Sequence, residues 1–120
     1  TLGVRCPTGQ ARITPGFKLP ARFVIHTVGP VYRRDGPRAP ALLASAHRSS
    51  LALARENGLE TVAFPAISCG SYGYPYEEAA KVALSACRES CQRLSEVRFV
   101  HFNQDTYDAW LTEARRQLGG

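Results

Sequence analysis

Three short apolar segments, each followed by a stretch of helical periodicity, constrain the fold of this 120-residue chain most strongly. They are residues 23–28, 61–64 and 97–102, and β-branched and aromatic side chains are frequent in them. Residues 23–28 are apolar almost throughout, which is typical of a strand covered on both faces. Strands and helices that alternate through short loops predict right-handed crossovers and a mainly parallel sheet. The expected class is therefore α/β, with three layers in which helices cover both faces of a central sheet.

The three intervening stretches carry apolar stripes at helical spacing. The first helix is expected to have Pro40 in its first turn and Gly58 just past its end. The second helix starts near Pro75 and runs to about Arg93, with an inward stripe of small residues that lets it lie close to the sheet. Asp105 is the expected N-cap of the third helix.

The beginning of the chain follows a different pattern. Residues 10–14 are expected to form a short strand, and Pro15-Gly16 has the chemistry of a type II turn. Pro20 limits pairing just before the first long strand. Three strands with three helices make a small sheet, whose central strands need further neighbours. Residues 1–120 are therefore expected to be one domain that resembles the later part of something larger.

Composition excludes several classes of protein. Hydrophobic residues make up 44% of the chain and charged residues 21%, which is ordinary for a soluble globular domain. No run of about 18 apolar residues occurs, and the first ten residues lack the apolar core of a signal peptide. We therefore expect a cytoplasmic protein without a membrane partner. The net charge of +5 comes from scattered arginines and favours anionic ligands in general.

The four cysteines do not indicate a metal site. Cys87 and Cys91 stand four residues apart on one helix, where cysteine commonly serves as a small core residue. Cys6 and Cys69 lie far from them in the sequence, and no C-x-x-C or H-x3-H spacing accompanies any of the four. The prediction is that the chain has no metal ligands and no cofactor.

The loop at residues 67–74 carries the clearest chemical signal. It follows a presumed parallel strand, at the sheet edge where open α/β sheets place their ligands. Gly70 and Gly73 let the backbone turn sharply, and successive N–H groups from about Cys69 to Tyr72 could then converge on an anion. The following helix begins at a proline, which lacks an N–H, so the loop amides should do most of the binding. An ordinary glycine-rich turn between a strand and a helix would explain the same residues.

Other phosphate-binding motifs are excluded by their missing residues. Gly-Lys does not occur, so there is no P-loop, and G-x-G-x-x-G is absent as well. A cysteine phosphatase would need an arginine six positions after Cys69, where Pro75 stands. Residues 70–73 match the G-x-x-G of an RNA-binding KH loop, yet they follow a buried strand and lack basic flanks.

No residue is identified as a catalyst from the pattern alone. His26 is expected inside a buried strand, bonded to a neighbouring backbone group, and His47 on a helix surface or edge. His101 alternates along the last strand and could point to either face. A dyad of Cys69 with a histidine has no local signature, and the adjacent carboxylates at 77 and 78 fit a first helical turn.

Two blocks of sequence resemble the macrodomain family. Residues 64–75 read FPAISCGSYGYP, which is similar to that family's second phosphate-binding loop, F-P-x-I-S-S/T-G-x-Y-G-Y-P. Residues 6–30 read CPTGQARITPGFKLPARFVIHTVGP, which resembles the family's C-x-T-G-x-A to I-H-T-V-G-P segment. The YGYP form is similar to the branch that hydrolyses O-acetyl-ADP-ribose and mono-ADP-ribosylated proteins. The resemblance implies the macrodomain fold for essentially the whole chain.

The resemblance also assigns ligand-binding residues. It implies that the loop wraps the diphosphate and distal ribose of ADP-ribose, with these residues at the ligand: Ser68, Cys69, Gly70, Ser71, Tyr72 and Gly73. Phe102 matches an aromatic residue that stacks on adenine, although a core position in an alternating strand explains the same ring. Asn103 stands beside it, where an acidic residue is common. Cys69 stands where threonine or serine is more frequent, which loses a good hydrogen bond.

Family members begin with a strand, an N-A-A-N loop and a G-G-G-V-D-type loop that are credited with substrate orientation, and residues 1–120 contain neither motif. The catalytic residues are therefore unknown. The implied function is binding of ADP-ribose and hydrolysis of ADP-ribosyl adducts by water attack at the distal ribose, with ADP-ribose or an ADP-ribosylated protein as partner. The alternatives are a non-catalytic reader of ADP-ribose, poly-ADP-ribose or RNA, with nucleic acid as a secondary partner, and an inert structural fragment.

Overall fold

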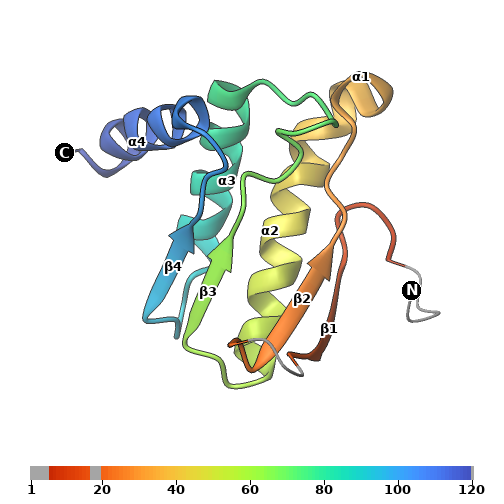
Figure 1. The fold of residues 1–120 in the computed structure, drawn as a ribbon, viewed down its shortest axis with the longest axis vertical. Coiled ribbons are helices and arrows are strands. Elements are labelled where there is room, and N and C mark those ends of the chain that lie inside the picture. Colours follow the sequence, from red (N-terminus) through yellow and green to blue (C-terminus); the bar gives the residue numbers. More distant parts are fainter. Residues whose placement is uncertain (1–5, 17–19, 120) are drawn as a thin grey trace.

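The computed structural model describes residues 6–16 and 20–119 (Figure 1). Its first two strands, β1 (Ala11–Pro15) and β2 (Phe23–Thr27), form an antiparallel pair in which Ala11 lies opposite Thr27. The short strand predicted at residues 10–14 is thereby confirmed, one residue later in the chain. The predicted turn at Pro15-Gly16 extends into residues 17–19 and so lies partly outside the described residues.

The second pair of strands is parallel, as the sequence predicts. Strand β3 (Thr61–Phe64) has the predicted bounds, and β4 (Glu96–Phe99) pairs with it so that Phe64 lies opposite Phe99. Strand β4 ends three residues before the predicted end, because residues 100–103 leave the sheet and turn toward the last helix. Phe102 consequently lies beyond the strand and not within it.

The first long helix follows the sequence signals closely. A short helix α1 (Tyr32–Asp35) and a 3-10 turn η1 (Gly36–Arg38) lead into α2 (Ala39–Glu56). Gly58 has a φ of +68°, and the N–H of Leu59 donates to the carbonyl of Ala54 at 2.9 Å, which closes the C-terminus. The expected boundaries of α2 are confirmed.

The other two helices differ from expectation at their ends. Helix α3 (Tyr76–Ser90) starts where predicted and ends three residues early. Helix α4 (Gln104–Leu118) is capped by Asn103 and not by Asp105, so the predicted cap was wrong. The Asn103 Oδ1 accepts a hydrogen bond from the N–H of Thr106 at 2.8 Å, and Asp105 lies inside the first turn. The cap moved because β4 ends early, which leaves Asn103 extended at the helix entrance.

The helices lie on one side of the strands. In Figure 1, α2 lies behind β2 and β3, and α3 lies behind β3 and β4; α2 also contacts β1, and α4 packs against α3. The core lies between these layers, with Leu43 and Leu51 of α2, Phe64 of β3 and Trp110 of α4 buried in it. In the described part of the chain the strands form two separate two-stranded sheets. The α/β class and the parallel pair are confirmed, whereas one continuous sheet with helices on both faces is not seen among these residues.

Two histidines occupy places that the sequence did not predict. His47 is fully buried in the core and not at a surface, with its ring 4.9 Å from that of Phe64 and its Nδ1 2.9 Å from the carbonyl oxygen of Leu43. His26 is exposed, and its Nε2 lies 2.9 Å from the Thr14 hydroxyl of β1 and not beside a backbone group. Both make structural contacts.

Within residues 6–16 and 20–119, no helix is both long and apolar enough to cross a membrane. The same residues contain no cluster of three or more His, Cys, Asp or Glu side chains that could hold a metal ion.

Candidate functional site

The loop at residues 67–74 connects β3 to α3 and is folded back on itself. The N–H of Tyr74 donates to the carbonyl of Ser68 at 2.9 Å, and that of Gly73 to the carbonyl of Gly70 at 3.0 Å. Ser68 and Gly73 both adopt left-handed backbone conformations, with φ of 67° and 71°. A left-handed serine is uncommon and is maintained only where its surroundings require it. These internal hydrogen bonds and backbone conformations define the shape of the loop.

Segments outside the loop hold it in place. The N–H of Tyr32, at the start of α1, donates to the carbonyl of Tyr72 at 3.0 Å. The ring of Tyr74 is buried, and its centre lies 4.9 Å from that of Tyr32. Burial and the nearby Glu78 raise the pKa of Tyr74 to about 12, so its hydroxyl keeps its proton at neutral pH. These contacts fix the loop against α1, the short helix that follows β2.

Three successive amides of the loop remain available. The N–H of Cys69 donates to the carbonyl of Ala66 at 3.2 Å and closes a turn, so it is not free as the sequence suggested. The N–H groups of Gly70, Ser71 and Tyr72 have no hydrogen-bond acceptor in the described part of the chain. A Cβ added at Gly70 would meet no atom within 4 Å. This part of the loop thus presents unpaired donors to open space, as an anion site requires.

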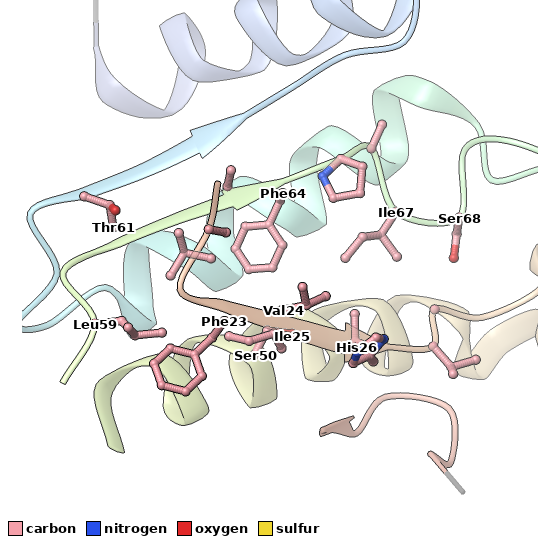
Figure 2. Close-up of a pocket in the computed structure, with 18 of the residues that line it drawn as sticks. Phe23, Val24, Ile25, His26, Ser50, Leu59, Thr61, Phe64, Ile67 and Ser68 are labelled. Carbon is pink, nitrogen blue, oxygen red and sulfur yellow. The ribbon is translucent and has the colours of Figure 1, made fainter. Parts of the chain in front are cut away.

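Ser68 adds a hydroxyl at one end of the cavity shown in Figure 2. Ser68 is 9% exposed as a residue, and its Oγ has no hydrogen-bond partner in the described part of the chain. A buried polar atom without a partner costs stability, and a ligand can remove that cost. The hydroxyl lies beside Gly29, where a Cβ would come within 2.3 Å of the Ser68 Oγ and 2.5 Å of the Ile67 Cγ2. The absence of a side chain at Gly29 therefore gives the loop room to pack against the end of β2.

The thiol of Cys69 is unsuited to nucleophilic catalysis. Cys69 is 4% exposed, and burial raises its pKa to about 11. At neutral pH it is a neutral thiol, whereas an attacking cysteine must be a thiolate. The arrangement therefore argues against a thiol enzyme and assigns Cys69 a packing role beneath the loop.

Phe102 and Asn103 follow the neighbouring strand and lie at the same edge of the sheet as the loop. Phe102 is 57% exposed as a residue, so the alternative of a core position is wrong. Its edge contacts the ring of Tyr76 at the start of α3, with centres 6.3 Å apart. Asn103 uses its Oδ1 to cap α4 and holds its Nδ2 3.5 Å from the Tyr76 hydroxyl. Tyr76 thus links the exposed ring to the helix that begins just past the loop.

Asp35 is a further buried polar residue near the loop that sequence reasoning missed. Its carboxylate accepts the N–H of Val31 at 2.9 Å and lies within salt-bridge distance of Arg34 and Arg38. Burial acts to raise its pKa, but the Val31 amide and the two arginines outweigh that effect and lower it. The carboxylate therefore stays ionised and fixes the turn from which Tyr32 reaches the loop. The run of arginines in this turn is the only sequence signal that could have indicated it.

The fold and this loop define an α/β domain in which exposed donors and an exposed aromatic ring gather at the carboxyl ends of two parallel strands. The model of the Macro domain family matches residues 2–83. The chain belongs to the Macro domain family, which confirms the resemblance seen in the sequence.

The relatives and solved structures agree with this assignment. A macro domain-containing protein of Ralstonia nicotianae is 48% identical over 113 residues, which cover 92% of this chain and 66% of that protein. The ADP-ribose glycohydrolase MACROD2 of Xenopus laevis is 56% identical over 85 residues, covering 70% of this chain and 20% of that protein.

Among structures, the Oceanobacillus iheyensis macrodomain with ADP has a TM-score of 0.92 at 37% identity, over 98% of this chain and 63% of that one. The Trypanosoma brucei macrodomain in complex with ADP-ribose has a TM-score of 0.79 at 40% identity, over 89% of this chain and 46% of that one. The chain thus spans somewhat less than two thirds of the length of the Ralstonia relative and of the Oceanobacillus structure.

Proposed function

We propose that this protein binds ADP-ribose, with the diphosphate at residues 67–74 and the adenine at Phe102. The observation that carries the proposal is the set of unpaired amides at Gly70, Ser71 and Tyr72, next to the unpartnered hydroxyl of Ser68. Backbone N–H groups arranged in this way bind phosphate oxygens through neutral dipoles. The related structures with ADP and ADP-ribose support this choice of ligand.

Phe102 supplies the second half of the proposed site. A base that stacks on an exposed ring gains about 1–3 kcal/mol. The ring is mostly free of the protein, so covering it with adenine would cost no core contact. Tyr72 is 41% exposed on the loop, where it would lie along the distal ribose.

Calorimetry with ADP-ribose tests this binding mode. Phe102→Ala should weaken the affinity roughly 5- to 150-fold, the equivalent of about 1–3 kcal/mol, with little change in stability. Phe102→Tyr keeps the ring and should bind like the parent chain. If Phe102→Ala loses stability and affinity to the same extent, the ring is structural and the proposed adenine site is wrong.

Salt dependence separates ADP-ribose from RNA as the ligand. The described part of the loop contains no lysine or arginine, so the diphosphate would be held mainly by amides. Affinity for ADP-ribose should therefore change little between low and moderate salt. An RNA reader should lose affinity steeply over the same range, because it releases counterions from many phosphates.

For the whole protein, the finer proposal is hydrolysis of ADP-ribosyl adducts on proteins or on O-acetyl-ADP-ribose. The similarity to a protein named ADP-ribose glycohydrolase supports it. The reaction would proceed by water attack at the distal ribose, and the burial of the Cys69 thiol, which raises its pKa, favours water over that cysteine as the nucleophile. Incubating a mono-ADP-ribosylated protein with residues 1–120 and measuring released ADP-ribose tests whether these residues are sufficient for the reaction. Binding without release would leave a reader of ADP-ribose.

A further inference from the structure

The connection between β2 and α2 carries three exposed arginines that have no role in the site described above. Arg33 and Arg34 belong to α1, and Arg38 ends the 3-10 turn η1. The side chains of Arg34 and Arg38 are 64% and 78% exposed, and Arg33 is exposed as well. We call these three residues the arginine turn. A patch of one charge sign attracts ligands of the opposite sign, and its neighbours decide which ligands reach it.

Asp35 holds the arginine turn in a defined shape. Its buried carboxylate accepts the N–H of Val31 at 2.9 Å and lies 3.4 Å from the guanidinium of Arg34 and 3.8 Å from that of Arg38. Within residues 6–16 and 20–119, Arg33 has no ion pair. Three positive charges thus stand against one buried negative charge, and the excess of positive charge faces solvent.

A cavity of about 550 Å³ lies between the arginine turn and the first turn of α3. The Tyr32 hydroxyl in this cavity lies 3.3 Å from a carboxylate oxygen of Glu78, so this carboxylate already has a partner. The guanidinium of Arg33 has none of this kind. The cavity therefore offers a cation that is available to a ligand, beside a largely apolar wall. The other lining residues are Gly36, Pro37 and Pro40.

The arginine turn lies at one end of the proposed ligand site. In Figure 1 the strands follow one another as β4, β3 and β2, and α1 lies at their carboxyl ends beside the loop that follows β3. Adenine is proposed at Phe102, which follows β4, and the distal ribose at Tyr72 in that loop. The carbonyl of Tyr72 accepts the N–H of Tyr32 at 3.0 Å, so the proposed ribose position is next to the arginine turn. A protein attached to the distal ribose would therefore leave the site on this side.

We propose, on the basis of the function proposed above, that the arginine turn binds acidic side chains of the protein that carries the ADP-ribose, in the segment that flanks the modified residue. A guanidinium binds a carboxylate through two parallel hydrogen bonds, which suits aspartate and glutamate. The diphosphate is proposed to be held by the neutral amides of the loop at 67–74. The arginines are therefore available to the attached polypeptide, and they would select acidic targets.

A second unit of a poly-ADP-ribose chain fits this surface less well. Such a unit brings another adenine, which gains stability by stacking on an exposed aromatic ring. Among the described residues the exposed large aromatic side chains are Tyr72, Phe102 and Tyr107, and none of them belongs to the arginine turn. The ring of Tyr32 is packed against that of Tyr74, with centres 4.9 Å apart. An acidic polypeptide needs no stacking partner, and its carboxylates can be spaced to meet the arginines.

Calorimetry with three ligands tests the inference. The first is free ADP-ribose, and the other two are peptides that carry ADP-ribose through a non-hydrolysable linkage and differ only in having glutamates or glutamines beside the modified residue. The glutamate peptide should bind about tenfold more tightly at low salt, and this preference should disappear in about 1 M salt. If ADP-ribose binds and the two peptides bind equally, the inference is overturned and the proposed function stands. If ADP-ribose itself does not bind, both are wrong.

Matched variants test whether the position of the charge matters. Arg33→Gln should reduce the preference for the glutamate peptide about two- to fivefold and leave the affinity for free ADP-ribose unchanged, whereas Arg33→Lys keeps the charge and should retain most of the preference. Arg115→Gln removes the same charge from an exposed position on α4 and should keep the preference in full. Equal losses at Arg33 and Arg115 would mean that only the net charge acts, which contradicts the inference. If Arg33→Gln weakens a dimer of ADP-ribose but not the glutamate peptide, the arginine turn binds phosphate and the inference is wrong.

Discussion

Gly29→Ala tests the close approach that forms the phosphate loop. The added methyl group would lie 2.3 Å from the Oγ of Ser68 and 2.5 Å from the Cγ2 of Ile67. Carbon atoms in ordinary contact are about 3.5–4.0 Å apart, so the loop must move by roughly 1 Å to accept the change. The residues that would move belong to the loop at 67–74, which carries the proposed ligand contacts.

The cost follows from packing. Overfilling a tight site destabilises by about 1–3 kcal/mol, and replacing glycine by alanine returns about 0.4–1 kcal/mol through the unfolded chain. We expect Gly29→Ala to lower the free energy of unfolding by roughly 1–2 kcal/mol, measured by urea titration. Adding Ser68→Ala removes one of the two atoms that the methyl group would meet and should recover part of the loss. The affinity for ADP-ribose should fall as well, because Ser68 is displaced.

Gly70→Ala is the matched control, because a Cβ at that position meets nothing within 4 Å. Its free energy of unfolding should equal that of the parent chain or exceed it by up to about 1 kcal/mol, through the same effect on the unfolded chain. Its affinity for ADP-ribose should nevertheless fall, since the methyl group enters the space proposed for the diphosphate. If Gly29→Ala proves as stable as Gly70→Ala, the tight contact between β2 and the loop does not exist, and our account of the loop is wrong.

Two further predictions concern stability. Asn103→Ala removes the side chain that accepts the Thr106 N–H and should cost about 1 kcal/mol in urea unfolding, whereas Asn103→Asp retains the cap; equal losses would contradict the capping role. Burial raises the pKa of Cys69 to about 11, and those of Cys87 and Tyr74 to about 12, so the folded chain holds these protons more tightly than the unfolded chain. The stabilisation is fully present below the ordinary thiol pKa of 9.0, and the urea midpoint should fall as the pH rises from there to about 12. A urea midpoint that rises over this pH interval would contradict the raised pKa values of these three groups.

Local signals predicted the elements well wherever the chain determines its own structure. Pro40 and Gly58 define the ends of α2 because proline fits a first turn and glycine adopts the left-handed conformation at the C-terminus. The alternation of strand and helix likewise predicted the parallel pair of β3 and β4. The glycine-rich loop was predicted at the correct sheet edge from its place after β3.

Contacts between distant segments could not be predicted in this way. The burial of His47 depends on the rings of Phe64 and Phe99, which no local pattern relates to it. The close contact of Gly29 with the loop is likewise a tertiary effect. The separation of the strands into two pairs is of the same kind, because periodicity predicts strands but not which strands are neighbours.

The hydrogen bond from the Tyr32 amide to the Tyr72 carbonyl has a practical consequence. One end of this bond lies in the loop that would receive a ligand, and the other is an ordinary backbone N–H outside that loop. Because the chemical shift of an amide proton depends on the length of its hydrogen bond, a single NMR resonance should follow any movement of the loop. Tyr32 is thus an intrinsic probe with which ligand occupancy can be followed without a substitution or an assay of turnover.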